Sequence, residues 1–248
     1  MSDARYSLRA WTSADDAVCG QWRNQAGLPP AAPAPDEQAL VLCDVDGRPQ
    51  ACARLRPHLG LDSPRYSFHI GRAVHAAAEL GLYHCQDTLL LGNDHTGEAE
   101  LVDLAHAPDC PQPQQALSAL LEALLKPWLA DPANRERQLV VELAGWRRAD
   151  GRSPFWDGLG RFFYPADPSP QRARWGEAWP AHLAALMPRQ TLYLSFLAEP
   201  ARQALGRAPE CAGPALQALA SQGFAYSRHV RIDDGGPIWA LQASTRQV

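Results

Sequence analysis

The stretch Asp87–Leu104, DTLLLGNDHTGEAELVDL, decides the fold class of this chain. Two short apolar runs, Asp87–Leu91 and Ala99–Leu104, flank the polar segment Gly92–Gly97. Apolar runs of this length, bounded by turn residues, are typical of buried strands rather than of helices. We therefore expect two strands here, joined by a polar turn, with the rest of the fold built around them.

Strands and helices alternate on both sides of this stretch. Strands are expected at residues 6–11, 39–44, 50–59, 66–74, 138–144, 225–232 and 237–242. Helices are expected at 13–26, 114–129, 181–186 and 214–222, with shorter helical pieces at 75–80 and after Ser153, and an extended connector at 28–35. Interleaved strands and helices predict an α/β fold with a mixed β-sheet flanked by helices. We expect one domain over residues 1–248, with an insertion at about 164–213 before the final helix and two strands.

Composition excludes several classes of protein. With 46% apolar and 20% charged residues, the 248-residue chain is expected to be globular rather than disordered. A net charge of −4 and the absence of a basic cluster argue against nucleic acid as a partner. The sequence contains no run of about 18 apolar residues, so no membrane span is predicted. Met1–Ala10 does not have the pattern of a signal peptide. The six cysteines form no C-x-x-C pair, so we expect reduced thiols in a cytoplasmic protein and no metal site.

Several segments in a fixed order resemble the arginine N-succinyltransferase family, over roughly Tyr6–Ala240. The longest are Asp62–Gly71 (DSPRYSFHIG), His75–Tyr83 (HAAAELGLY), Thr88–Leu101 (TLLLGNDHTGEAEL) and Ser153–Phe163 (SPFWDGLGRFF). The resemblance implies a fold related to the GCN5-type N-acetyltransferases. It also implies succinyl transfer from succinyl-CoA to the α-amino group of arginine, in arginine catabolism. Succinyl-CoA would be a co-substrate, and no bound cofactor or metal is implied.

The resemblance assigns the acyl donor to the strand at 99–104. In this fold class a central strand offers backbone N–H groups to the thioester, and the following loop and helix N-terminus bind the CoA pyrophosphate. Leu104 matches the family position that lies against succinyl-CoA, although a core leucine is an equally good interpretation. The family's glycine-rich loop is replaced here by Ala107–Gln115, APDCPQPQQ, which has neither glycine nor arginine. Pro111 and Pro113 lack N–H groups, so this loop is poorly suited to phosphate.

Two further family residues are missing. The family's proposed proton-donating histidine aligns with Pro209, or with Ala208 after a one-residue shift, and neither residue can transfer a proton. A family lysine is absent from the corresponding segment Arg174–Trp179. The sequence therefore leaves the catalytic residue unknown.

The polar segment and the strand after it supply the candidates for acceptor binding. These are Asn93, Asp94, His95 and Glu100, of which a carboxylate can pair with the planar guanidinium group of arginine. The alternative is that residues 94–97 form only a structured turn. Two hypotheses about function stay open. One is an N-acyltransferase with altered donor contacts; the other is a catalytically degenerate regulatory, arginine-binding or partner subunit, in a homo-oligomer or with a family paralogue.

Overall fold

A computed structural model describes residues 6–27 and 36–246, so the connector predicted at 28–35 lies outside the described residues. All of its strands join one ten-stranded sheet in the order β1-β2-β3-β6-β7-β10-β9-β4-β5-β8. The strands are β1 (Tyr6–Ala10), β2 (Gln38–Asp44), β3 (Pro49–Arg56), β4 (Ser67–Ala77), β5 (Leu82–Gly92), β6 (Ala99–His106), β7 (Gln138–Glu142), β8 (Leu192–Tyr193), β9 (Ala225–Arg231) and β10 (Pro237–Gln242).

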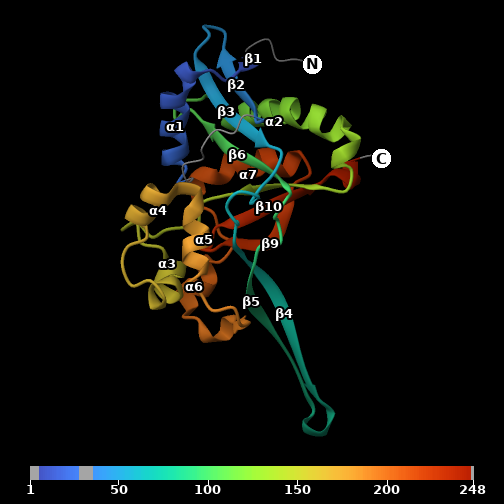
Figure 1. Cartoon of the computed structure of the whole chain (residues 1–248), viewed down its shortest axis with the longest axis vertical. Coiled ribbons are helices and arrows are strands. Elements are labelled where there is room, and N and C mark those ends of the chain that lie inside the picture. Colours follow the sequence, from blue (N-terminus) through green and yellow to red (C-terminus); the bar gives the residue numbers. More distant parts are fainter. Residues whose placement is uncertain (1–5, 28–35, 247–248) are drawn as a thin grey trace.

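Helices flank this sheet, as the alternation of elements predicted (Figure 1). They are α1 (Asp16–Gln25), α2 (Pro113–Ala130), α3 (Pro154–Gly158), α4 (Ser169–Trp175), α5 (Trp179–Ala184), α6 (Glu199–Ala204) and α7 (Gly213–Ser221). In the described part of the chain only β6 and β7 are parallel neighbours, and the other ladders are antiparallel. The expected mixed α/β sheet is confirmed.

Two hydrophobic clusters stabilise the sheet. In the first, α2 packs on β2, β3 and β6 and against α7, and buries a stripe of leucines at helical spacing that includes Leu117, Leu121 and Leu124. In the second, α3 and α5 cover β4, β5 and β9, with Phe68 and Phe155 fully buried at its centre. The segment 164–213 supplies α4, α5, β8 and α6 to this second side of the molecule.

The β4–β5 hairpin corrects one expectation. Residues 75–80 were expected to be helical, but His75 pairs with His84 and β4 continues to Ala77. Only Ala78–Leu80 makes a short 3₁₀ turn, which ends at Gly81 with φ 58°. The alanines favour a helix by intrinsic propensity, but pairing with β5 determines the conformation. The far end of this hairpin projects well beyond the rest of the molecule (Figure 1) and exposes Leu80 and Tyr83.

No helix in the described ranges is long and apolar enough to cross a membrane.

Candidate active site

The central parallel strands β6 and β7 separate after a short ladder. Their pairing covers only Ala99–Leu101 and Leu139–Val141. At Asp103 the backbone of β6 takes a left-handed conformation with φ 55°, and the register with β3 shifts between Cys52 and Arg54. These are the marks of a β-bulge, which bends a strand and increases its twist. Beyond the bulge β6 follows β3 and leaves β7.

The chain after β7 is held on the other side of the gap. The Leu143 N–H donates to the Pro237 carbonyl oxygen at 3.0 Å, so this segment follows β10. Gly145 approaches the Asp234 backbone so closely that a Cβ atom would lie 2.2 Å from the Asp234 carbonyl oxygen. Only glycine allows this approach. The two strands therefore diverge, and each is fixed by a different neighbour.

The conformation of Asp103 is supported by buried ion pairs. The Asp103 carboxylate accepts from the Arg54 Nε at 2.7 Å, and Arg23 Nη1 lies 3.6 Å from it. Arg54 also pairs with Glu37 at 2.6 Å. Aspartate tolerates left-handed backbone better than most residues, and a paired carboxylate offsets the cost of its own burial. The bulge that opens the gap is thus anchored by side chains from β3 and α1.

An apolar cavity of about 400 Å³ lies beside the gap. Its walls come from α1, the second half of β6, the chain after β7 and the start of α7. Leu104 and Leu143 line this cavity, and they also line the smaller polar pocket described next. Leu104 is 4% exposed and belongs to the first hydrophobic cluster as well, so it is both a core residue and a cavity wall. The other lining residues are Trp22, Gln25, Ala26, Ala105, His106, Pro108, Ala144, Cys211, Ala212, Pro214 and Ala215.

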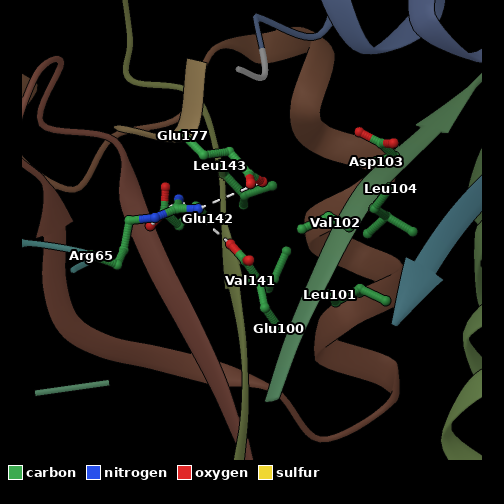
Figure 2. Close-up of a pocket in the computed structure, with 10 residues that line it drawn as sticks. All are labelled: Arg65, Glu100, Leu101, Val102, Asp103, Leu104, Val141, Glu142, Leu143 and Glu177. Carbon is green, nitrogen blue, oxygen red and sulfur yellow. Dashed lines mark ion pairs between the residues drawn. The ribbon is translucent and has the colours of Figure 1, made fainter. Parts of the chain in front are cut away.

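Three carboxylates surround one guanidinium group in the polar pocket (Figure 2). Arg65 Nη1 lies 3.1 Å from Glu142 and 3.6 Å from Glu100, and Arg65 Nη2 lies 4.0 Å from Glu177. Glu100 comes from β6 and Glu142 from β7, whereas Glu177 comes from the turn between α4 and α5. The free volume of the pocket is about 30 Å³, which is room for one or two water molecules.

Burial perturbs the protonation of Glu100. Its side chain is 3% exposed, and loss of hydration raises its pKa to about 7, although Arg65 and Arg56 oppose the shift. Arg56 lies 3.3 Å from Glu100 and 2.8 Å from Glu177, and it also pairs with Glu37 at 2.8 Å. A carboxyl group with a pKa near 7 can accept or release a proton at neutral pH.

The acceptor candidates predicted from sequence do not all lie in this pocket. Glu100 lines it, whereas Asn93 and Asp94 are exposed on the turn between β5 and β6. That turn is held by backbone contacts, including a bond from the Thr96 N–H to the Asn93 carbonyl oxygen at 3.0 Å. His95 is buried, which lowers its pKa to about 4, and the charge of Glu142 acts on it in the opposite direction.

Asp94 and His95 instead join a cluster of imidazoles. Asp94 Oδ2 lies 3.0 Å from His229 Nε2. The His229 ring packs against the rings of His95 and His69, with centroids 4.4 Å and 4.8 Å away. The neighbouring Arg228 has φ 60°, a conformation that is strained for a non-glycine residue. The other ring nitrogen of His229, Nδ1, lies 3.0 Å from the Ser227 carbonyl oxygen.

The structure also shows where the residues lie that stand in place of the family's histidine and its glycine-rich loop. Pro209 precedes a 3₁₀ turn at Glu210–Ala212, and this turn leads into α7 at the rim of the apolar cavity. In the loop before α2, the N–H groups of Ala107 and Cys110 are bonded to the carbonyl oxygens of Gln50 and Ala107. Pro113 is the first residue of α2. The prolines and these two bonds reduce the number of N–H donors that this loop can offer a pyrophosphate.

Sequence reasoning missed three residues of the polar pocket. Arg65 stood inside a matched family segment but was read only as part of that pattern. Glu142 is the last residue of the buried strand β7, and an acidic residue at the end of an apolar run was the available signal. Glu177 lies in the irregular insertion, where no pattern connects it to β6. Only the tertiary structure brings these side chains to Glu100.

Known proteins with similar sequences belong to a single family. A family model described as Arginine N-succinyltransferase beta subunit matches residues 27–248. The arginine N-succinyltransferase of Yersinia pestis (strain Pestoides F) is 33% identical over 222 residues, which cover 86% of this chain and 61% of that protein. The arginine N-succinyltransferase of Yersinia enterocolitica serotype O:8 is 35% identical over 192 residues, which cover 77% of this chain and 54% of that protein. The chain therefore spans less than two thirds of the length of these relatives.

The fold has a counterpart among solved structures. Arginine/ornithine succinyltransferase subunit AI from Pseudomonas aeruginosa superposes with a TM-score of 0.75, covering 97% of this chain and 77% of that chain, at 21% identity. The two structures share the class of fold, a mixed α/β sheet flanked by helices. The family match extends over most of the chain, and the chain belongs to the arginine N-succinyltransferase family.

Proposed function

We propose that this chain is an N-acyltransferase that moves a succinyl group from succinyl-CoA to the α-amino group of arginine. The observation that carries the proposal is the divergence of β6 and β7, which places an apolar cavity beside a buried carboxylate cluster. The cavity suits the pantetheine arm of an acyl-CoA. Carboxylates are the groups that recognise a guanidinium.

The reaction needs few protein groups. The amine nitrogen attacks the thioester carbonyl carbon, a C–N bond forms, the C–S bond breaks, and CoA leaves as a thiolate that takes up a proton. Holding the two substrates together supplies much of the rate. The amine must also lose a proton, and Glu100 lies on the donor strand with a pKa of about 7. We assign it the role of proton acceptor for the amine.

Release of free CoA thiol from succinyl-CoA and arginine tests this proposal. We expect turnover by the wild type, with kcat/KM rising with pH through about 7 as Glu100 ionises. Glu100→Gln removes the proton acceptor and is expected to lower kcat by about a hundredfold or more, with little change in the dissociation constant of succinyl-CoA. Turnover by this variant at the wild-type rate would remove Glu100 from the mechanism.

Specific observations favour the second hypothesis, a catalytically degenerate subunit. Pro209 stands at the family histidine position, the loop before α2 is proline-rich, and the carboxylate pocket is already filled. Under this hypothesis the chain would work as a regulatory, arginine-binding or partner subunit, in a homo-oligomer or with a family paralogue. Folded protein that binds neither succinyl-CoA nor CoA, and releases no thiol, would favour it over the first.

A further inference from the structure

Arg65 fills the carboxylate pocket with its side chain. It lies on the connection between β3 and β4, and its side chain is 8% exposed, so a full positive charge is held inside the protein. Figure 2 shows it reaching from one side toward the carboxylates of Glu142, Glu100 and Glu177. An arginine guanidinium is a rigid, planar donor group, and a free arginine would present the same group to the carboxylates of Glu142 and Glu177.

The pocket cannot take a second guanidinium while Arg65 is present. The remaining volume of about 30 Å³ accommodates only one or two water molecules. The pocket also adjoins the apolar cavity, because Leu104 and Leu143 form walls of both.

Charge balance determines what would replace Arg65. Without it, Glu142 loses the ion pair at 3.1 Å, and Glu100 and Glu177 keep Arg56, which they share with Glu37. Buried carboxylates without a partner are costly. A pocket emptied of Arg65 would therefore favour a cation of similar shape over a neutral molecule.

The backbone on both sides of Arg65 is anchored. Leu59 exchanges backbone hydrogen bonds with Gly97 and Glu98, at 2.8 Å each. The Tyr66 ring lies under the Arg189 guanidinium, 4.8 Å from its centroid. Because both flanks are held, departure of the Arg65 guanidinium would require rotation of its side chain rather than movement of the backbone. Glu177, the most exposed of the three carboxylates, marks the side of the pocket nearest to solvent.

We propose that Arg65 is a built-in occupant of the acceptor site, and that free arginine binds only when the Arg65 guanidinium has left. This inference rests on the proposed function for the identity of the acceptor. It assigns Arg65 the role of a specificity-determining residue that competes with the substrate.

The test compares arginine binding to wild type, Arg65→Ala and Arg65→Gln, with citrulline as the matched neutral ligand. The glutamine variant keeps much of the side-chain volume without the charge, and it serves if the alanine variant does not fold. We expect the variants to bind arginine about tenfold or more tightly than the wild type does, and to bind citrulline no better. Millimolar guanidinium chloride should raise the melting temperature of the variants relative to sodium chloride at equal ionic strength.

Arg9→Ala is the control, because Arg9 forms an ion pair at 2.7 Å with the buried Asp15, outside this pocket. It should lose stability without gaining arginine affinity. Equal arginine affinity in wild type and both Arg65 variants would overturn the proposal. It would also be overturned if citrulline raised the melting temperature of the variants as much as guanidinium does. Succinyl-CoA is titrated into the same proteins. Loss of donor binding in all of them would count against the proposed function, whereas the arginine and guanidinium results alone decide the role of Arg65.

Discussion

His95 and Glu100 are buried titratable residues whose pKa values move in opposite directions. Burial disfavours the charged form of both, so it lowers the pKa of His95 to about 4 and raises that of Glu100 to about 7. Both changes alter how stability depends on pH, because the folded and unfolded chains then bind different numbers of protons.

His95 is expected to make the fold sensitive to acid. Between pH 6.5 and about 4 the unfolded chain binds the proton and the folded chain does not, so stability falls as the pH falls through this window. Over the whole of this pH range, His95 is expected to reduce the free energy of unfolding by about 3 kcal/mol. Urea unfolding of wild type and His95→Gln at several pH values measures it. A difference in stability between the two proteins that stays constant from pH 7 to pH 4 would contradict this prediction.

Glu100 is expected to change the pH dependence of stability in the opposite direction from His95. Between pH 4.5 and about 7 the folded chain holds the proton and the unfolded chain does not, so stability falls as the pH rises. Glu100→Gln removes this dependence, and the stability of the variant relative to the wild type should increase by about 3 kcal/mol across the window. The same unfolding series measures it, and a relative stability that falls with rising pH would exclude the assignment.

The hydrophobic pattern of the sequence predicted correctly those strands and helices whose local preference agrees with their tertiary packing. The leucine spacing predicted α2, and the apolar runs around residues 92–97 predicted β5 and β6. The pattern was wrong at residues 75–80, because an alanine-rich segment with helical propensity pairs as part of a long hairpin. It also could not predict the bulge at Asp103, since that conformation depends on Arg54, which lies 49 residues away in the sequence.

The loop between β6 and α2 leads to a prediction about the donor. Its prolines lack N–H groups, and the N–H groups of Ala107 and Cys110 are already bonded. The pyrophosphate of CoA should therefore contribute little to binding. We expect succinyl-pantetheine to bind with a dissociation constant within about threefold of that of succinyl-CoA, because the apolar cavity contacts the part that the two share. Calorimetry with the two thioesters measures this, and binding of succinyl-CoA alone would show that phosphate contacts exist.

At the scale of the whole molecule, the candidate site is assembled from distant parts of the chain. Glu100 could be chosen from the sequence because it is a carboxylate within a predicted strand and lies in a matched segment. Arg65, Glu142 and Glu177 could not, since each belongs to a different element and their proximity depends on the order of strands in the sheet. The division of the chain into one domain with an insertion at 164–213 stays a prediction, as do cytoplasmic localisation and association with a second subunit.

The central claim is that the cavity beside β6 and β7 binds the acyl donor. The most direct measurement is calorimetric titration of succinyl-CoA into wild type, Cys211→Trp and Val45→Trp. Cys211 is an exposed residue that lines the cavity, so an indole there should fill it without disturbing the core. Val45 is 76% exposed and outside the cavity, and it controls for the added indole. We predict saturable binding to wild type and Val45→Trp, and binding weakened about tenfold or more in Cys211→Trp. Equal affinity in all three proteins, or no binding by any of them, would contradict the account.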